Sequence, residues 1–338
     1  MSDQLPDGED GFVARIEAHR AELRRHCYRM TGSYDESEDL VQEVLLRAWR
    51  ARGSYEGRSS LRTWLYRVAT NTCLDHLRRV TRRPAVYEPI PGMDHGSDDP
   101  PPRIAWLQPY PDETFAHVPA PDDGPAVAAE HRETMELLFL AAIQHLPPRQ
   151  RAALILRDVL EIPAADAADM LDMSVASLNS ALQRARPTIR GHLPRHRAEW
   201  APATGPTAEE REVLRQYMEC AAAMDVKAMA GLLSEDIRLT MPPNPYWFTG
   251  RDTLLRFLAP TLDPDSPTYF GEWRHLPTAA NGMPAAGGYV RRPGTSVYRA
   301  QVLDVLRVEG GRIAEITSFE PHLFPVFGLP LVLPGSGR

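Results

Sequence analysis

Apolar side chains recur at three- and four-residue steps between residues 12 and 83, a spacing that is typical of amphipathic α-helices. We expect three helices here: 12–29, 38–52, and a third from Ser59 or Ser60 to about residue 82. Ser37 is placed to cap the second helix, in which acidic residues come early and arginines late, as the helix dipole favours. Pro84 should stop the third helix because proline lacks an amide hydrogen. This part of the chain is therefore predicted to be a helical bundle.

Residues 84–127 lose this periodicity. The stretch is rich in proline and carries eight acidic residues against one arginine, which is the composition of a linker. A structureless run of this length is unusual inside one compact domain, so it is expected to separate two domains. Its segment 106–112, Trp-Leu-Gln-Pro-Tyr-Pro-Asp, is too aromatic for a plain spacer and is a candidate docking segment.

Helical periodicity returns at residue 128, and strand-like alternation begins near residue 237. The expected helices of the middle part are 128–144, 149–159, 164–171 and 174–191, and the last two form a helix-turn-helix pattern. Beyond a break at 204–207 we expect helices over 207–223, 226–233 and 251–259 and strands near 237–241, 269–276, 286–292, 297–308 and 312–319. This last part is predicted to be α+β with a mostly antiparallel sheet. The predicted domains are 10–84, 128–200 and 205–330, with the linker 85–127 between the first two.

Composition narrows the class of protein further. The 338 residues are 43% apolar and 25% charged, which excludes a disordered tail, and no apolar run is long enough to span a membrane. The acidic, polar start predicts no secretory signal peptide, and the three cysteines have neither a metal nor a redox spacing. We therefore expect a reduced, cytoplasmic protein without a metal or cofactor.

The formal net charge of −7 at first argues against binding to nucleic acid. Its distribution changes that conclusion, because residues 12–83 hold fifteen arginines and nine acidic residues, whereas 84–127 carry a net charge of −7. Arginines of the third predicted helix fall mainly opposite its apolar side, where they can neutralise phosphates. Tyr55 can stack on bases, and Asn71 can read a base edge. A solvated basic face without a nucleic-acid partner would give the same pattern.

The order of residues is more specific than their composition. The runs 39–49 (Asp-Leu-Val-Gln-Glu-Val-Leu-Leu-Arg-Ala-Trp) and 61–71 (Leu-Arg-Thr-Trp-Leu-Tyr-Arg-Val-Ala-Thr-Asn) resemble region two of the extracytoplasmic-function group of bacterial sigma-70 factors. The resemblance implies that the first run binds the β′ clamp of RNA polymerase through Asp39, Gln42 and Glu43. It also implies that the −10 promoter element is contacted by Tyr55, Arg58, Arg62, Arg67, Asn71, Arg78 and Arg79. The alternative is that the acidic residues are ordinary side chains on a helix surface and bind no partner.

A second resemblance follows at the distance that this family shows. The runs 146–157 and 174–186 are similar to the start of sigma region four and to its recognition helix, which would lie in the major groove at the −35 element. Ser174 caps that helix, and Val175, Leu178 and Leu182 should pack inward. The residues left for DNA are Ser174, Ser177, Asn179, Ser180, Gln183, Arg184 and Arg186. Asn179 stands where the family is often basic, and the turn 160–166 is more acidic than usual, so −35 binding is expected to be weaker or differently specified.

The last third resembles the SnoaL-like polyketide-cyclase fold, a cone of curved sheet and helices, in its element order and in residues 236–243 and 248–252. The fold class is thus multidomain, with two all-α sigma domains (the helical bundle and the helix-turn-helix) and an α+β cone. Strand alternation places Asp304 on an apolar face, where a carboxylate can act as a general base. The residues expected to line a ligand pocket are Tyr246, Trp247, Trp273, His275, Tyr289 and Asp304. The alternative, which we favour, is that Asp304 pairs with an arginine or with backbone groups and that the aromatic residues are core.

These resemblances imply a sigma factor that directs promoter recognition and transcription initiation and needs no catalytic residue. Its partners would be promoter DNA and core RNA polymerase, at the β′ clamp and the β flap, with the acidic linker in the active-site cleft. Sigma factors with this extension commonly lack a separate anti-sigma factor. We therefore expect the C-terminal domain to regulate in cis, packing on regions two and four or on 106–112. Two alternatives stay open: a DNA-binding regulator whose SnoaL-like domain binds or turns over a small ligand, and a repressor that uses only the helix-turn-helix.

Overall fold

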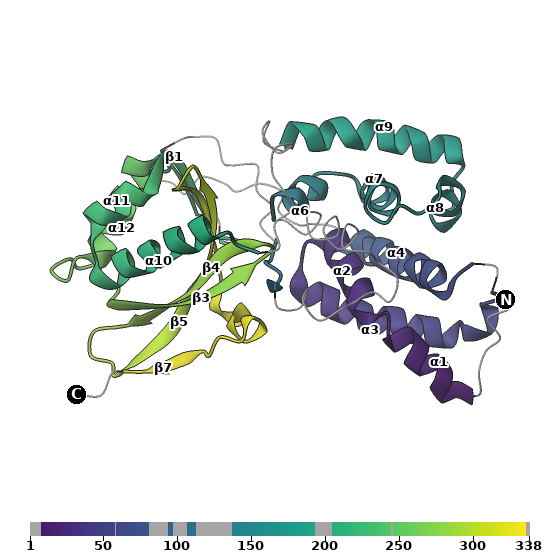
Figure 1. Ribbon diagram of the computed structural model, residues 1–338, viewed down its shortest axis with the longest axis horizontal. Helices are drawn as coiled ribbons and strands as arrows, with labels where there is room; N and C mark the ends of the chain where they lie inside the picture. Colours follow the sequence, from purple (N-terminus) through teal and green to yellow (C-terminus); the bar gives the residue numbers. More distant parts are fainter. Residues whose placement is uncertain are drawn as a thin grey trace. The chain divides into compact units, whose positions relative to one another are not determined.

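The chain divides into two compact units (Figure 1). The computed structural model describes residues 8–57, 59–80, 94–96, 107–112, 137–192, 205–244 and 246–335. The first unit contains the described residues up to 80 together with 137–192, and the second contains 94–96, 107–112 and the described residues from 205 onward. Within these ranges no helix is both long and apolar enough to cross a membrane.

The first unit is helical wherever it is described, as the sequence predicts. Its N-terminal part consists of α1 (Gly8–Glu17), α2 (Arg20–Thr31), α3 (Tyr34–Arg50), the short η1 (Arg52–Ser54) and α4 (Leu61–Arg79). Its C-terminal part consists of α6 (Leu137–Gln144), α7 (Pro148–Leu154), the π-helical turn η3 (Ile155–Val159), α8 (Ala164–Met170) and α9 (Val175–His192). Helices α2, α3 and α4 pack on one another, α7 and α8 contact α4, and α9 packs on α7 and α8 (Figure 1).

Two helix boundaries differ from the prediction. The single helix expected over 12–29 is broken at Ala18–His19, and this break lets Phe12 of α1 pack against Trp49 of α3, with ring centroids 6.4 Å apart. Helix α3 begins earlier than expected, because Ser33, and not Ser37, is its cap: the Ser33 side chain accepts the amide of Glu36. Ser37 is instead buried in the first turn and donates to the carbonyl of Tyr34.

The second unit is α+β, as predicted. Its helices are α10 (Ala208–Ala223), α11 (Val226–Leu232) and α12 (Arg251–Leu262), followed by the short η5 (Pro321–Phe327). Its strands are β1 (Leu233–Thr240), β2 (Trp247–Thr249), β3 (Glu272–Ala280), β4 (Met283–Arg291), β5 (Val297–Glu309), β6 (Arg312–Phe319) and β7 (Val332–Pro334). They form one sheet in the order β2-β1-β6-β5-β4-β3, with β7 beside β5. Only the β1–β6 pair is parallel among the described strands.

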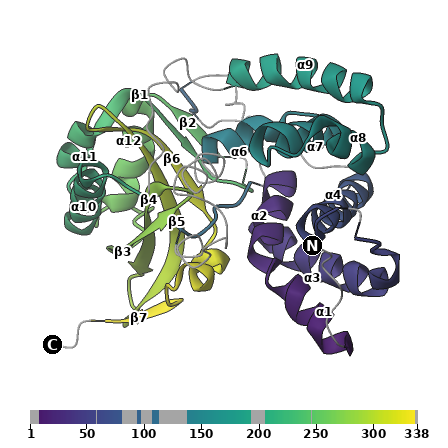
Figure 2. The same ribbon diagram turned by 45° about the vertical axis from the view of Figure 1, so that its right-hand side comes forward.

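The core of this unit lies between its helices and one face of the sheet. Helices α10, α11 and α12 gather on that face (Figure 2), and their apolar side chains meet Leu239, Leu306 and Ile316 from the strands. Alternation along each strand directs these residues toward the helices. The three-residue strands β2 and β7 are too short for such a pattern to be recognised in the sequence, and neither was predicted.

Candidate nucleic-acid interface and ligand cavity

The outer face of α3 presents the acidic residues expected to bind polymerase. Asp39 and Gln42 are exposed, whereas the opposite face of the helix buries Leu40 and Val41. Glu43 is half-buried and accepts a 2.7 Å hydrogen bond from Arg47, which reaches across to Asp75 on α4. The amphipathic pattern of α3 therefore brings all three predicted residues to one side of the helix.

The loop before α4 packs against that helix through an aromatic contact. The Tyr55 ring lies 5.4 Å from the Trp64 ring, and the Tyr55 hydroxyl donates to the carbonyl of Ser59. Trp64 is half-buried and also packs edge-on against Phe12. Arg58, the remaining loop residue expected to contact DNA, lies outside the described residues.

The arginines of α4 each have an acidic or carbonyl partner in the free protein. Arg78 donates to the Asp75 carboxylate at 3.0 Å, and Arg79 donates to the backbone carbonyl of Asp75. Both arginine side chains are exposed, and Asn71 on the same helix is half-buried. These pairs are worth little in water, so phosphates can displace them at small cost.

Arg62 is held more firmly than the other arginines. Its guanidinium donates to Glu22 of α2 at 2.8 Å and lies over the ring of buried Tyr66, whose hydroxyl also donates to Glu22. Burial acts to raise the pKa of Glu22, but hydrogen bonds from His19 and Arg62 together with the Arg62 charge lower that pKa to about 2. Glu22 is thus ionised at neutral pH, and Arg62 has a structural role in joining α2 to α4.

Arg67 of α4 points to the helix-turn-helix. It donates to Asp169 of α8 at 2.9 Å, and its second nitrogen lies 3.9 Å from Asp172 in the following turn. All three side chains remain substantially exposed. An arginine expected to contact the −10 element is therefore paired, in this arrangement of the first unit, with carboxylates of the helix-turn-helix.

The helix-turn-helix presents one polar face on α9. Ser174 caps the helix by accepting the amide of Ser177, and Leu178 and Leu182 are buried, as predicted. Val175 is 42% exposed, contrary to the prediction, because it lies in the first turn of α9. The exposed face carries Ser177, Asn179, Ser180, Gln183, Arg184 and Arg186.

One of these exposed residues is paired through two hydrogen bonds. The Nε and Nη2 atoms of Arg186 donate to the carboxylate of Asp158, at 3.0 and 2.9 Å, and this pairing raises the arginine pKa. Arg184, two residues earlier on the helix, is exposed.

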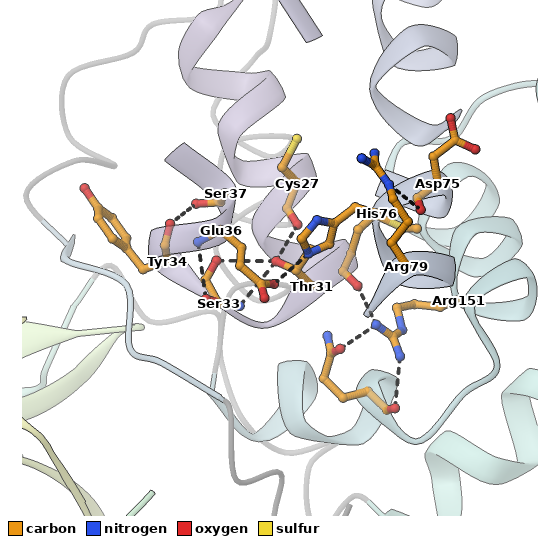
Figure 3. Close-up of polar contacts among 12 residues, drawn as sticks. Cys27, Thr31, Ser33, Tyr34, Glu36, Ser37, Asp75, His76, Arg79 and Arg151 are labelled. Carbon is orange, nitrogen blue, oxygen red and sulfur yellow. Dashed lines mark hydrogen bonds and ion pairs between the residues drawn. The ribbon is translucent and has the colours of Figure 1, made fainter. Parts of the chain in front are cut away.

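Arg151 of α7 is a buried arginine that the sequence did not single out (Figure 3). It is only 4% exposed, and its guanidinium donates to the carbonyls of Ile143, Gln144 and Leu146 at 3.0–3.1 Å. It therefore closes the turn between α6 and α7. The signal in the sequence was its position, because a helix places Arg151 on the same side as the apolar Leu154 and Ile155.

The same guanidinium joins the two halves of the first unit. It also donates to the side-chain oxygen of Gln144 and to the carbonyl of Met30 at the end of α2, and the Gln144 amide donates to the carbonyl of Arg29. Carbonyls in the last turn of a helix lack partners within the helix and carry partial negative charge, so they suit a cation. Gly32, with φ of +74°, ends α2 next to the Gln144 side chain, 3.0 Å from where a Cβ would stand.

The second unit contains a cavity of about 650 Å³. Four of the predicted pocket residues, Tyr246, Trp273, His275 and Asp304, line it. The prediction is wrong for the two others, which lie outside the cavity wall. Trp247 is fully buried and stacks on His95 of the linker, with centroids 4.0 Å apart. Tyr289 points to the opposite face of β4, where it packs edge-on against Phe324.

Asp304 lies deep in this cavity. It is 4% exposed and accepts hydrogen bonds from the Tyr217 hydroxyl at 2.9 Å and from the Ser318 hydroxyl at 2.5 Å. Burial raises the pKa of Asp304 to about 6, although both hydroxyls act to lower it. The favoured expectation of an arginine or backbone partner for Asp304 is wrong: its partners are two hydroxyl donors, and neither of them was predicted.

His275 and Trp273 form a stacked pair on the cavity wall. Their rings are 5.6 Å apart and nearly parallel, and burial lowers the pKa of His275 to about 4, so this histidine is neutral at physiological pH. Gly288 on the neighbouring strand makes room for both rings, because a Cβ there would stand 3.1 Å from the His275 ring and 3.2 Å from the Trp273 ring. Among the described residues no His, Cys, Asp or Glu cluster could hold a metal ion.

Two short segments of the linker are bound along the second unit. The Asp94 carboxylate accepts from Arg256 at 2.6 Å, and His95 accepts the amide of Thr249 through its backbone carbonyl. Farther along, the backbone of Tyr110 exchanges two hydrogen bonds with Asn281, at 2.9 and 2.7 Å.

Burial accompanies these linker contacts. Tyr110 is 1% exposed, Leu107 is 3% exposed, and Pro111 forms a β-bridge with Ala280. Asp112 accepts the amide of Gly282, and its burial raises its pKa to about 6. The candidate docking segment therefore does dock, on the turn between β3 and β4, as far as residues 107–112 are concerned.

Comparison with known proteins gives the class of the molecule. The Sigma-70 region 2 family matches residues 15–83, the Sigma-70 region 4 family matches 136–188, and the SnoaL-like domain family matches 214–316. A basic four-helix part, a helix-turn-helix and an α+β cone, in this order, define a promoter-recognition factor of the sigma-70 type with a SnoaL-like extension.

Individual relatives make the assignment more specific. The ECF RNA polymerase sigma factor SigG of Mycobacterium tuberculosis is 39% identical over 328 residues, which cover 94% of this chain and 84% of SigG. SigJ of the same organism is 27% identical over 90% of both chains. The chain belongs to the extracytoplasmic-function sigma factors, and it therefore serves promoter recognition and transcription initiation.

Solved structures agree with the fold. The crystal structure of Mycobacterium tuberculosis SigJ matches with a TM-score of 0.59 and 23% identity and covers 94% of this chain and 99% of that one. Another match is the sigma factor RpoE of Bartonella quintana, which was solved in complex with the anti-sigma factor NepR; it covers 55% of this chain with a TM-score of 0.37. The expected absence of a separate anti-sigma factor stays a prediction.

Proposed function

We propose that this sigma factor is regulated in cis by its C-terminal domain, residues 205–330, which holds the linker 85–127 that joins region two (10–84) to region four (128–200). The observation that carries the proposal is the binding of linker segments 94–96 and 107–112 to the C-terminal unit. A linker bound at these two segments cannot follow another path until these contacts break. The energy of the contacts therefore opposes any rearrangement of regions two and four that moves the linker. The protein itself performs no catalysis and acts in the cytoplasm.

Each predicted surface is proposed to bind a different partner during initiation. Asp39, Gln42 and Glu43 offer polymerase an acidic face, for which we propose the β′ clamp as the partner, and region four is proposed to contact the β flap. The arginines of α4 serve the −10 element through phosphate contacts, and the polar face of α9 reads the −35 element in the major groove. Asn179 is uncharged at a position where the family is often basic, and Arg186 is paired with Asp158. Both features limit phosphate contacts from α9.

Releasing the linker is expected to strengthen binding to core polymerase. Replacing Tyr110 with alanine removes a buried aromatic side chain from the linker itself and leaves the residues of the C-terminal domain unchanged. Burial of such a side chain is worth roughly 1.5–3 kcal/mol, so if the linker must leave its site, the affinity should rise about tenfold or more. Fluorescence anisotropy with labelled core polymerase measures the affinity, and run-off transcription measures the consequence.

The half-buried Gln108, two residues before Tyr110, supplies a matched control through Gln108→Ala. This variant should behave like the natural protein. Equal polymerase affinity of Tyr110→Ala and the natural protein would contradict cis regulation through the linker, and a comparison with residues 1–204 alone gives the upper limit of the effect.

Freeing Arg67 should improve binding to the −10 element. In Asp169→Asn the ion pair with Arg67 is lost, and the guanidinium becomes available to a phosphate. Since an exposed pair is worth at most about 1 kcal/mol, we expect a two- to fivefold rise in affinity for single-stranded −10 DNA at low salt. Asp166→Asn, which removes an exposed acid from the same helix, is the control for net charge. Equal gains in both variants would mean that only net charge matters.

A further inference from the structure

The cavity in the C-terminal unit has the size and lining of a small-molecule site. Its volume of about 650 Å³ falls in the range of roughly 300–1,000 Å³ that is usual for such sites. Apolar and aromatic side chains from the helices and the strands form most of the wall, among them Met229, Leu239, Phe257, Leu258, Phe270 and Ile316. A space of this kind favours a molecule with a rigid apolar skeleton.

The charges that face this space are all negative. Asp304 lies within the cavity and Glu320 at its wall, and the residues that line it include neither lysine nor arginine. His275 contributes no positive charge near neutral pH, because burial keeps it unprotonated. An anionic ligand would therefore enter without a partner for its charge, which is costly in a buried site.

Asp304 can accept more hydrogen bonds than it receives from the protein. A carboxylate has about four lone-pair sites, and the described residues use two of them, one through Tyr217 and one through Ser318. Nearby, the Trp273 indole nitrogen and the Nδ1 atom of His275 are buried and have no hydrogen-bond partner in the described part of the chain. The rings of Tyr217 and Trp273 also line the cavity, and aromatic rings attract cations.

We propose that this cavity binds an apolar organic amine, whose protonated nitrogen donates to Asp304 while its skeleton fills the space between α12 and the sheet. Aromatic faces and a buried carboxylate with unused acceptor sites are the two groups that recognise such a cation. Binding would make the C-terminal domain a sensor, and this last step alone rests on the proposed cis regulation.

A matched series of naphthalene derivatives tests the proposal on the full-length chain. Naphthylmethylamine, naphthalenemethanol and naphthoic acid share one skeleton and carry a cationic, a neutral and an anionic head. By isothermal titration calorimetry at pH 7.5, the amine should bind at least tenfold more tightly than the alcohol, and the acid should show no binding. Asp304→Asn should reduce the amine to the affinity of the alcohol. Binding of the acid as tight as that of the amine, an unchanged preference in Asp304→Asn, or no binding of any probe would overturn it.

A second measurement needs no variant. The groups that face Asp304 are the hydroxyls of Tyr217 and Ser318, with His275 and Glu320 farther along the wall. Asp304 itself gains a proton near pH 6. Amine affinity should be constant above this pH and fall about tenfold per unit below it, whereas the alcohol should bind equally throughout. An amine affinity that does not change between pH 7.5 and pH 4.5 would exclude Asp304 as its partner. Because neither assay contains polymerase, failure here is separable from failure of the linker experiment.

Discussion

Methionine in place of Arg151 is expected to lower the free energy of unfolding of the first unit by about 3–5 kcal/mol. The guanidinium is buried and supplies donors to carbonyls of the α6–α7 turn and of α2, and a hydrogen bond to a charged group is worth about 1.5–3 kcal/mol. Methionine fills a similar volume but leaves these acceptors without a donor. Urea denaturation measures the loss, and peptide-resolved hydrogen exchange assigns it to α6–α9.

Arg149, two residues earlier on the same helix, is exposed and gives the control. Arg149→Met should change stability by no more than about 0.5 kcal/mol. Lysine at position 151 keeps the charge but lacks the planar fork, so it should recover only part of the loss. If the methionine variants at 149 and 151 unfold at the same urea concentration, the buried network adds nothing to stability.

Reversing the charge of α3 is expected to abolish promoter-directed transcription. The double variant Asp39→Arg, Glu43→Arg places two positive charges on the surface that we propose for polymerase. A like-charge contact costs several kcal/mol, so affinity for core polymerase should fall at least about a hundredfold. Folding should be little affected, because Asp39 is exposed and the Glu43–Arg47 pair that is lost is a surface pair. Anisotropy with core polymerase and run-off transcription measure the two effects.

Asp166 is exposed on helix α8, so Asp166→Arg changes charge at a site outside this surface and is the control. Its affinity for core polymerase should stay close to that of the natural protein. Similar weakening in both proteins would show that overall charge, and not this face of α3, determines binding.

Local patterns in the sequence were sufficient to locate most helices and strands. Alternation along β5 correctly placed Asp304 on the inner face, and Ser60 and Ser174 cap their helices as expected. The cap of α3 was misplaced because it depends on Gly32, whose left-handed backbone ends α2 just before Ser33. A serine in the sequence does not show by itself whether a left-handed turn precedes it, so Ser33 and Ser37 could not be told apart as caps.

Long-range packing is what the patterns did not contain. Trp247 turns out to be covered by His95, a partner 152 residues away, and β4 is buried on both faces, so its composition does not tell which face Tyr289 shares with the cavity. Arg151 was overlooked because arginine is almost always exposed, and its acceptors are backbone carbonyls that carry no signature in the sequence.

The parallel pairing of β1 with β6 has a consequence for synthesis of the protein. Strand β1 can pair early with β2, but it cannot pair with β6 until residues 312–319 have left the ribosome. Regions two and four are complete at residue 192, some 120 residues earlier, which at about 5–20 residues per second is on the order of ten seconds. Each newly made chain therefore passes through a period in which its promoter-binding parts have emerged and the site that holds the linker has not yet formed.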